Sequence, residues 1–260
     1  MITTIINDCR DDNAAGRQIA RASSILQCPI NFIGVKNEIE AAGNLTDVLD
    51  AIEERQGVIL VNVAPRDAKA KKWKNGSPFG YFRHKNTLII STIDGLSLSL
   101  AKKLKLTGAI HSMNIPRVVE ILLEKKYISA EQKEYITNTQ FRSFDFLPRI
   151  AEYLIKEKEI ESEIIPIEEI SDMPETIWWV DVFGNCKTTI LENELADRNI
   201  IIRNNRLPYY TRLKDVPDKE PALIVGSSGL GQKRFLEIVV QGGSAEAQFN
   251  LAVGDDLSLA

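Results

Sequence analysis

Short apolar runs alternate with amphipathic stretches over the first 156 residues of the chain. The run at residues 2–6 is β-branched and stops at Asn7-Asp8, and residues 17–26 then place apolar side chains near helical spacing. By the same criteria we expect strands at 57–63 and 87–91, and helices at 44–55, 96–104, 117–125 and 146–156. Strands that alternate with helices predict an α/β domain, and the nearly continuous apolar strands predict a mainly parallel sheet.

The pattern changes after residue 156. Residues 156–175 are densely charged and contain Pro166 and Pro174, which is typical of a linker. Short β-type runs separated by glycine turns follow, and we expect strands at 177–182, 187–191, 199–203, 222–225 and 235–240. Such a series of short strands predicts a small β-barrel or sandwich. We therefore predict two domains, residues 1–165 and 166–260.

Composition and charge exclude several classes of protein. The chain has 260 residues, of which 44% are hydrophobic and 26% charged, and this apolar content excludes a disordered protein. The net charge of −4 gives no basic footprint for nucleic acid. Apolar stretches reach about eight residues, whereas a membrane-spanning helix needs roughly 20. We therefore expect neither a nucleic acid nor a membrane as partner.

The cysteines, the histidines and the first residues bear on compartment and metal binding. Cys9, Cys28 and Cys186 lie far apart without a C-x-x-C pair, which favours a reducing cytoplasm over a disulfide scaffold. No secretory signal is apparent, since the first residues lack a basic region and a long apolar stretch. His84 and His111 have no second histidine or cysteine at ligand spacing, so we expect no metal site.

Polar groups follow three of the expected strands. Asp8 comes directly after the first strand, Arg66 follows the strand at 57–63, and Asp94-Gly95 follows the strand at 87–91. Ligands of open α/β sheets bind outside the carboxyl ends of strands, so this edge is a candidate site. A carboxylate such as Asp8 can accept two hydrogen bonds from a ribose diol, and Arg66 can hold an anion. The alternative for Asp8 is a loop aspartate that caps a turn.

Residues 226–233 resemble a phosphate-binding loop but lack its lysine. Their sequence, G-S-S-G-L-G-Q-K, has Gln232 where that loop requires a lysine. A strand pattern follows instead of the helix whose N-terminus would bind phosphate. We expect a tight hairpin here.

The most specific string in the chain is W-V-D-V-F-G-N-C-K-T at residues 179–188. A strand here would place Asp181, Phe183 and Asn185 on one face. An acid, an aromatic ring and an amide on one face can bind a cation, stack on a base and hydrogen-bond its edge. The alternative is a strand that ends in a Gly-Asn turn.

With three other segments, this string resembles the S-adenosyl-L-methionine (SAM) hydroxide adenosyltransferase family, which includes SAM-dependent fluorinases and chlorinases. Residues 5–8 (I-I-N-D) resemble the family's first strand with its Thr-Asp-Phe-Gly end, and residues 61–65 (V-N-V-A-P) resemble a strand ending in Asp-Pro-Gly or Tyr-Pro-Ala. Residues 141–148 resemble its Phe-His-Gly-Arg-Asp or Phe-Tyr-Ser-Arg segment, and residues 181–188 match Asp-x-Phe-Gly-Asn-x-x-Thr. The four segments occur in the family's order.

The resemblance implies an α/β N-terminal domain with a mainly parallel sheet, a small C-terminal β-barrel domain and a homotrimer. SAM is then the substrate, held between the N-terminal domain of one subunit and the C-terminal domain of its neighbour, and no cofactor is implied. Asp8 would bind the ribose hydroxyls, and Asp12 and Asp181 the methionine ammonium. Phe183 would stack on adenine, and Asn185 would hydrogen-bond its edge. The other implied substrate-binding residues are Pro65, Arg66, Phe141, Ser227, Ser228 and Ala245.

The implied chemistry is substitution at C5′ of SAM, in which the sulfonium leaves as neutral methionine. Where the hydrolytic branch carries an Asp-Arg-His set, this chain has Ala64, Lys71 and Arg142, and Ser143 matches the halide-contacting serine of the halogenase branch. Arg142, Ser143 and Lys71 are the candidate catalytic residues. We expect hydrolysis of SAM to adenosine and methionine. The alternatives are a protein that binds SAM or another adenosyl compound without turnover, and a SAM-dependent halogenase.

Overall fold

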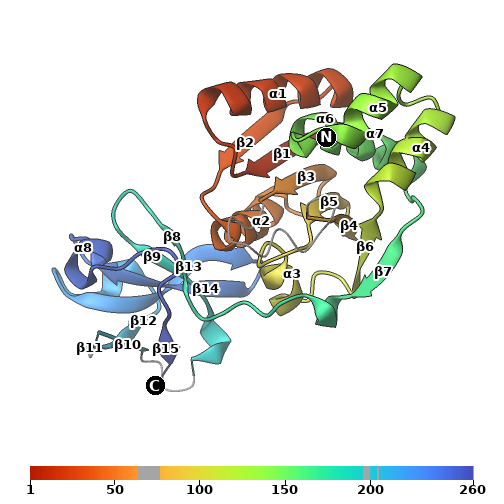
Figure 1. Ribbon diagram of the computed structural model, residues 1–260. Helices are drawn as coiled ribbons and strands as arrows, with labels where there is room; N and C mark the ends of the chain where they lie inside the picture. Colours follow the sequence, from red (N-terminus) through yellow and green to blue (C-terminus); the bar gives the residue numbers. More distant parts are fainter. Residues whose placement is uncertain (64–76, 196–199, 204, 260) are drawn as a thin grey trace. The chain divides into compact units, whose positions relative to one another are not determined.

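The computed structural model describes residues 1–63, 77–195, 200–203 and 205–259 (Figure 1). The chain divides into two compact units, Met1–Ser171 and Asp172–Ala260. The boundary predicted between residues 165 and 166 falls within strand β7 (Glu163–Pro166). Because β7 pairs with β6 (Ala109–Met113), it belongs to the first unit, which extends to Ser171.

A seven-stranded sheet forms the centre of the described part of the first unit. Parallel pairings join four neighbouring strands, and antiparallel pairings join β5 to β4, β4 to β6 and β6 to β7. Since two successive antiparallel pairings restore the direction, β6 runs with the parallel strands, and the sheet is mainly parallel, as predicted. In spatial order the strands are β2 (Ile30–Gly34), β1 (Ile2–Asn7), β3 (Gly57–Asn62), β5 (Thr87–Thr92), β4 (Phe79–His84), β6 and β7.

Helices cover both faces of this sheet (Figure 1). On one face α1 packs against α6 and α7, and α4 packs against α5 and α7, whereas on the other face α2 packs against α3. The helices are α1 (Asp12–Leu26), α2 (Glu38–Ile52), α3 (Ser99–Lys103), α4 (Ile115–Glu124), α5 (Ala130–Asn138), α6 (Arg142–Asp145) and α7 (Leu147–Glu157), and a 3-10 turn, η2 (Ile167–Glu169), follows β7.

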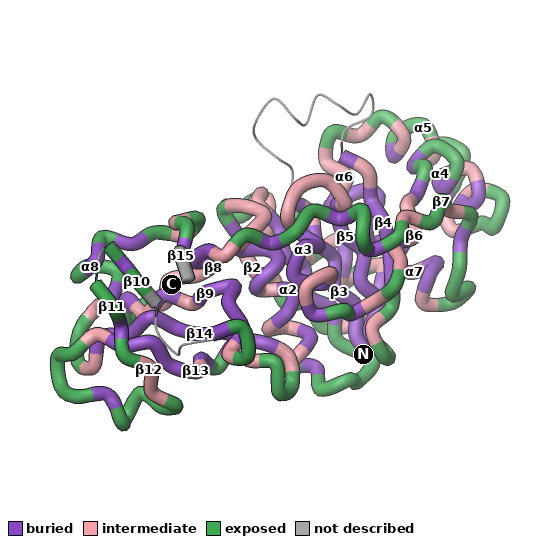
Figure 2. The backbone as a smooth tube through the Cα atoms, turned by 90° about the horizontal axis from the view of Figure 1, so that it is seen from below, coloured by how far each residue is buried: buried purple, intermediate pink, exposed green. Residues whose placement is uncertain are grey.

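The central strands are buried on both faces, which explains their nearly continuous apolar sequences (Figure 2). Successive side chains of a strand point to opposite faces. Ile5 of β1 and Leu60 of β3 join the core that α1, α4 and α7 cover, whereas their neighbours Ile6 and Ile59 are buried outside that cluster. Burial on both faces excludes water from the sheet, so polar groups collect at its ends.

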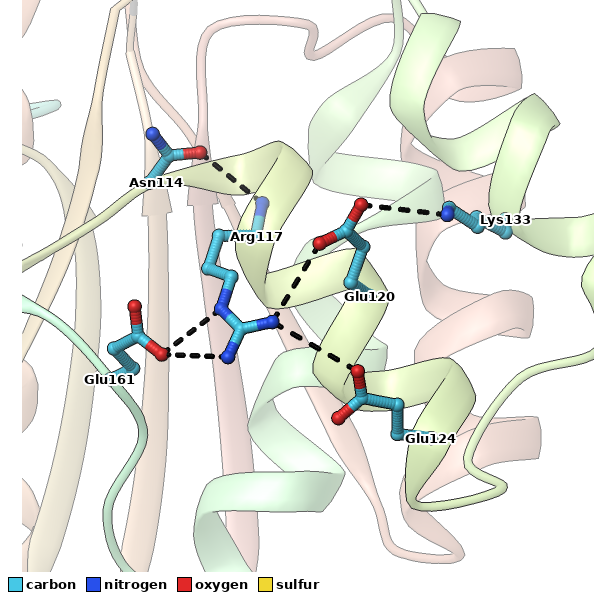
Figure 3. Close-up of polar contacts among 6 residues, drawn as sticks. All are labelled: Asn114, Arg117, Glu120, Glu124, Lys133 and Glu161. Atoms are coloured by element: carbon cyan, nitrogen blue, oxygen red, sulfur yellow. Dashed lines mark hydrogen bonds and ion pairs between the residues drawn. The ribbon is translucent and has the colours of Figure 1, made fainter.

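A network of charged side chains on the surface of α4 is centred on Arg117 (Figure 3). Its Nε and Nη2 donate to Glu161 Oε2 at 3.0 and 2.9 Å, and Nη1 lies 3.7 Å from Glu120 and 3.9 Å from Glu124. Lys133 of α5 lies 3.6 Å from the same Glu120. Glu161 is the main cause that raises the pKa of Arg117. The network joins α4, α5 and the segment before β7.

The second unit consists mainly of antiparallel strands. One sheet has the order β12 (Tyr209–Tyr210), β13 (Pro221–Leu230), β14 (Lys233–Val240), β9 (Cys186–Leu191) and β8 (Ile177–Val180), and the other has the order β11 (Asn205–Leu207), β10 (Ile200–Ile202) and β15 (Ser258–Leu259). The shorter elements are α8 (Ala245–Phe249), η3 (Glu192–Glu194) and η4 (Leu213–Asp215). Within the described ranges these pairings form two sheets, and closure into a barrel stays a prediction.

Each segment expected from the sequence overlaps a helix or strand of the same kind, but several ends differ. Helix α1 begins at Asp12 instead of Arg17, because Asp11 caps it by accepting from the backbone N–H of Ala14 at 3.0 Å. Strand β8 ends at Val180, two residues before its expected end. None of the helices that the structure describes is long and apolar enough to cross a bilayer.

Candidate functional site

The carboxyl ends of three parallel strands lie side by side in the first unit. Asn7 is level with Asn62 in the register of β1 and β3, and Asp8 N donates to Asn62 O at 3.4 Å. At the end of β5, Thr92 Oγ1 donates to Val63 O at 3.0 Å. Asp8 therefore lies at the sheet edge where the sequence placed a candidate site.

The loop that carries Asp8 is fixed by two buried amides, which the sequence analysis missed. Asn7 Nδ2 donates to Gln18 Oε1 at 2.7 Å, and Asn7 Oδ1 accepts from Cys9 N at 2.8 Å. Both side chains are 0% exposed. One sequence signal could have identified Asn7 and Gln18. An amide ends the strand, and the helix that follows carries a glutamine in line with its apolar residues Ala22 and Leu26. Asp12, in contrast, is exposed at the first position of α1.

The loop after β5 is tied to the start of α2. Leu96 N donates to Glu38 Oε2 at 2.7 Å. Gly95 has φ +79°, and a Cβ there would lie 2.1 Å from the same carboxylate oxygen, so another residue would be strained and would displace that carboxylate. This close approach holds the half-buried Asp94 at the sheet edge. The candidates that follow β3, namely Ala64, Pro65, Arg66 and Lys71, lie outside the described residues.

Helix α6 presents the candidate catalytic residues Arg142 and Ser143. Arg142 is half-buried and donates through Nη1 to Ser77 O at 3.3 Å, and its burial lowers the pKa of the guanidinium. Ser143 is 1% exposed, and its Oγ has no hydrogen-bond partner among the described residues. A buried hydroxyl without a partner retains the capacity to bind a small polar molecule.

Packing on α1 fixes the position of α6. Phe141 stacks on Phe144 at 5.4 Å between ring centroids, and the guanidinium of Arg17 lies over both rings. Asp145 is 1% exposed and accepts from Tyr135 Oη and Thr139 Oγ1, each at 2.5 Å. The ring of Phe141 is thus engaged in this stack, and the aspartate anchors the helix that carries Ser143.

In the second unit, the candidates Asp181, Phe183 and Asn185 lie on a turn. Asp181 Oδ1 accepts from Phe183 N at 2.8 Å and from Asn185 N at 2.9 Å, and Asp181 Oδ2 accepts from Asn185 Nδ2 at 3.0 Å. The expectation of a strand with all three side chains on one face is wrong, because the aspartate closes the chain on itself. The Gly-Asn turn is the interpretation that the structure supports.

A second segment supports this turn. Glu246 N donates to Gly184 O at 2.9 Å, and a Cβ on Gly184 (φ +78°) would lie 2.0 Å from Ser244 Oγ. Ala245, between these two residues, is 0% exposed. The structure thus brings Ala245 beside Asp181–Asn185, while Phe183 remains 73% exposed at the tip.

The remaining candidates of the second unit lie in strand β13. Ser227 is exposed and Ser228 is buried, at a bulge between Val225 and Gly229. Residues 226–230 are strand, not the helix-linked loop of a phosphate site, and they lead into the hairpin that we predicted. In β9, burial raises the pKa of the Cys186 thiol to about 12, so this thiol is protonated at neutral pH and is a poor nucleophile.

The two histidines have ordinary hydrogen bonds. His84 Nδ1 lies 3.1 Å from Leu106 O, and His111 Nδ1 lies 3.2 Å from Ser162 Oγ while its ring stacks on Tyr81. In the portion of the chain that the structure describes, no group of three metal-ligating side chains comes together.

Comparisons with known proteins bear mainly on the second unit. Residues 175–258 match the family model of the SAM hydroxide adenosyltransferase C-terminal domain, which confirms the family resemblance for this part of the chain. A crystal structure of an uncharacterized conserved protein from Thermotoga maritima is 17% identical, with a TM-score of 0.70 and coverage of 99% of both chains. A conserved hypothetical protein from Thermus thermophilus is 16% identical, with a TM-score of 0.60 and coverage of 98% of this chain and 99% of that chain. At these identities the two structures show the fold alone. No curated protein matches the sequence.

Proposed function

We propose, from the premise that the second unit belongs to the SAM hydroxide adenosyltransferase C-terminal domain family, that this chain binds SAM and cleaves it with water to adenosine and L-methionine. The oxygen of water forms a bond to C5′, and the C5′–S bond breaks with its electron pair on sulfur. The sulfonium becomes a neutral thioether, and one proton is released. SAM is the substrate in this proposal, and no cofactor takes part.

The turn at residues 181–185 is the observation that carries this proposal. Because Asp181 Oδ2 accepts from Asn185 Nδ2, the orientation of the Asn185 amide is fixed, and its Oδ1 accepts no hydrogen bond from a described residue. A fixed amide oxygen suits the exocyclic amino group of adenine. The exposed ring of Phe183, two residues away, offers a face for the base to stack on. Ala245 supplies backbone beside the same turn.

The ribose and methionine ends of SAM need acceptors. We assign the ribose diol to Asp8, because a carboxylate at a sheet edge can accept both hydroxyl protons. The methionine ammonium is assigned to Asp12 and Asp181, with Ser227 or Ser228 at the same end of the ligand. These assignments follow the family resemblance. The resemblance also assigns Phe141, Pro65 and Arg66 to the substrate.

The reaction itself demands little acid–base chemistry. A neutral thioether is a good leaving group, so the protein must mainly align water with C5′ and partly desolvate it. Ser143 Oγ, buried and without a described partner, suits the positioning of that water. Arg142 is adjacent in sequence and half-buried, and its positive charge would favour the hydroxide form of that water. The family resemblance assigns Lys71 to the same site.

A direct test incubates the purified chain with SAM and follows adenosine and methionine by chromatography. We expect the two products in equal amounts, at a rate proportional to the protein concentration. The absence of products despite tight SAM binding would favour the second candidate, a protein that binds adenosyl compounds without turnover. The observation behind that candidate is the sequence: Ala64 and Arg142 replace the family's Asp and His. The absence of any binding would overturn both.

A halogenase is the third candidate, and Ser143 alone supports it. It predicts that chloride accelerates the loss of SAM and that 5′-deoxy-5′-chloroadenosine accumulates. Equal rates of SAM loss across chloride concentrations would exclude it.

A further inference from the structure

Two buried amides lie directly beneath the candidate ribose-binding residue Asp8. Asn7 is the last residue of β1, and Gln18 lies in the second turn of α1. Gln18 Oε1 accepts from Asn7 Nδ2 at 2.7 Å, and Gln18 Nε2 donates to Cys9 O at 3.3 Å and to Ala14 O at 3.2 Å. Both side chains are 0% exposed. The pair therefore connects the end of the strand, the loop and the helix that follows.

The orientations of both amides follow from neighbouring backbone groups that can act only as hydrogen-bond donors or only as acceptors. The backbone N–H of Cys9 can only donate, so the atom of Asn7 that faces it is Oδ1, and Nδ2 must face Gln18. Gln18 then accepts through Oε1, which turns Nε2 towards the carbonyls of Cys9 and Ala14, and carbonyls can only accept. Each amide thus satisfies the other, and neither can rotate by 180° without losing hydrogen bonds on both.

This arrangement fixes the backbone on both sides of Asp8. The N–H of Asp8 donates to Asn62 O, the N–H of Cys9 donates to Asn7 Oδ1, and the carbonyl of Cys9 accepts from Gln18. Three backbone groups of the loop therefore have fixed partners. Buried polar groups that lose such partners cost free energy, so the loop keeps this conformation as long as both amides are present.

We propose that the Asn7–Gln18 pair is a positioning device that holds the Asp8 carboxylate for a ligand with an intact ribose diol. The selectivity for the diol rests on the proposed function, whereas the positioning of the loop does not. Gln18 touches no ligand in this scheme and acts through Asp8.

The first test measures selectivity by calorimetry with adenosine and 2′-deoxyadenosine. We expect the wild-type chain to prefer adenosine by about tenfold or more, because the deoxy compound lacks one of the two hydroxyl groups that donate to the carboxylate. Gln18→Met removes both hydrogen-bonding functions and should reduce that preference to about threefold or less. Gln18→Glu keeps the acceptor for Asn7 but loses the donor to Cys9 O, so its preference should be intermediate.

A matched control separates positioning from general stability. Thr46 of α2 is 1% exposed, and its Oγ1 donates to Ala42 O at 3.1 Å. Thr46→Val removes a buried hydrogen bond of the same unit without touching the loop at residues 8–11. It should lower the thermal midpoint and leave the preference for adenosine unchanged.

A second readout needs no ligand. Cys9 is half-buried within the loop, so the rate at which its thiol reacts with iodoacetamide reports loop opening. Cys28, half-buried in the same unit with its Sγ 3.2 Å from Thr3 Oγ1, is the internal reference. We expect Gln18→Met to accelerate Cys9 alkylation several-fold relative to Cys28, and Thr46→Val to leave the ratio unchanged. If Gln18→Met does not fold, Gln18→Glu, which keeps the acceptor for Asn7, replaces it in both readouts.

The two readouts distinguish the possible failures. A wild-type chain that binds neither nucleoside would refute the proposed function, while the alkylation ratio would still decide whether the pair positions the loop. An unchanged alkylation ratio in both Gln18 variants would overturn the inference, whatever the ligand data show. A changed alkylation ratio with an unchanged preference for adenosine would overturn the claim that the pair contributes to selectivity for the ribose diol.

Discussion

Asp181 uses both carboxylate oxygens within its own turn, and this use decides where its neighbours point. The sequence left two interpretations open for Asp181, Phe183 and Asn185: one face of a strand, or a strand that ends in a Gly-Asn turn. The turn forms for a local physical reason, because a side chain that accepts from the backbone two and four residues later competes with strand pairing. Periodicity alone carries no information on that competition.

Gly184 offers a test of the turn. Gly184→Ala places a Cβ at positive φ and against Ser244, whereas Gly254→Ala, at φ +95°, meets no atom within 4 Å. We expect the first substitution to lower the free energy of unfolding by about 3 kcal/mol, from backbone strain and the clash together. The second should lower it by about 1 kcal/mol, from strain alone. Urea unfolding measures both values, and equal losses would contradict the tight packing of Gly184.

The role of Asp8 is a second prediction at this scale. Asp8→Asn keeps the shape of the side chain but removes the charge that strengthens its bonds to two hydroxyls. The affinity for adenosine should fall by about tenfold or more, since hydrogen bonds to charged groups contribute about 1.5–3 kcal/mol. The thermal midpoint should change little, because the residue lies on a loop. Calorimetry showing unchanged affinity would mean that Asp8 does not bind the ribose.

At the scale of elements, hydrogen bonds between helices hold the candidate catalytic segment. Asp145 anchors α6 through Tyr135 of α5 and through Thr139, and Ser143 lies on that short helix.

The sequence predicted the strand ends that carry Asp8 and Asp94, because apolar runs stop there abruptly. It did not predict β2, β4, β6, β7 or α5, since their apolar runs are short and interrupted by glycine or polar residues, and β2, β6 and β7 pair with strands that lie far away in sequence. The anchoring of α6 likewise depends on contacts that no local pattern reports.

The bond between Tyr135 and Asp145 predicts a dependence on pH. It raises the pKa of Tyr135 above the ordinary value of 10.0, so the bond contributes fully below that value and is lost as the pH rises through the raised pKa. Tyr135→Phe should lower the free energy of unfolding by about 1 kcal/mol at neutral pH, given a half-exposed ring. The difference from wild type should shrink in alkaline solution.

Thr139→Val is the control for this prediction. It removes the other hydroxyl bond to Asp145, but threonine does not titrate, so its effect should not shrink in the same way. Urea unfolding over a pH series provides the comparison. A constant Tyr135→Phe difference across the alkaline range would contradict the role assigned to the phenol.

At the scale of the whole molecule, an exposed apolar tip bears on assembly. Val182 is 94% exposed and Phe183 is 73% exposed, the two highest values among the large apolar side chains that the structure describes. The family resemblance implies a homotrimer with the ligand at the interface between subunits, called the seam below. We propose that this apolar tip lies in the seam. The contacts of a seam involve surfaces that are distant in the sequence, so only the resemblance, and no pattern in this chain, pointed to it.

Sedimentation velocity tests the assembly. We expect a particle with three times the mass of one chain, and we expect Val182→Glu to shift it towards the monomer. Ile164→Glu is the matched control, because Ile164 is also apolar and 65% exposed but lies in β7 of the first unit. A monomeric wild-type chain, or equal effects of the two substitutions, would contradict the proposed seam.

The central claim is that water attacks C5′ of SAM, and oxygen-isotope labelling tests it most directly. The chain is incubated with SAM in water enriched in oxygen-18, and the products are analysed by mass spectrometry. We predict adenosine with one heavy oxygen, at its 5′ position, and methionine with none. Adenosine without the label, or SAM recovered intact from a chain that binds it, would contradict the account.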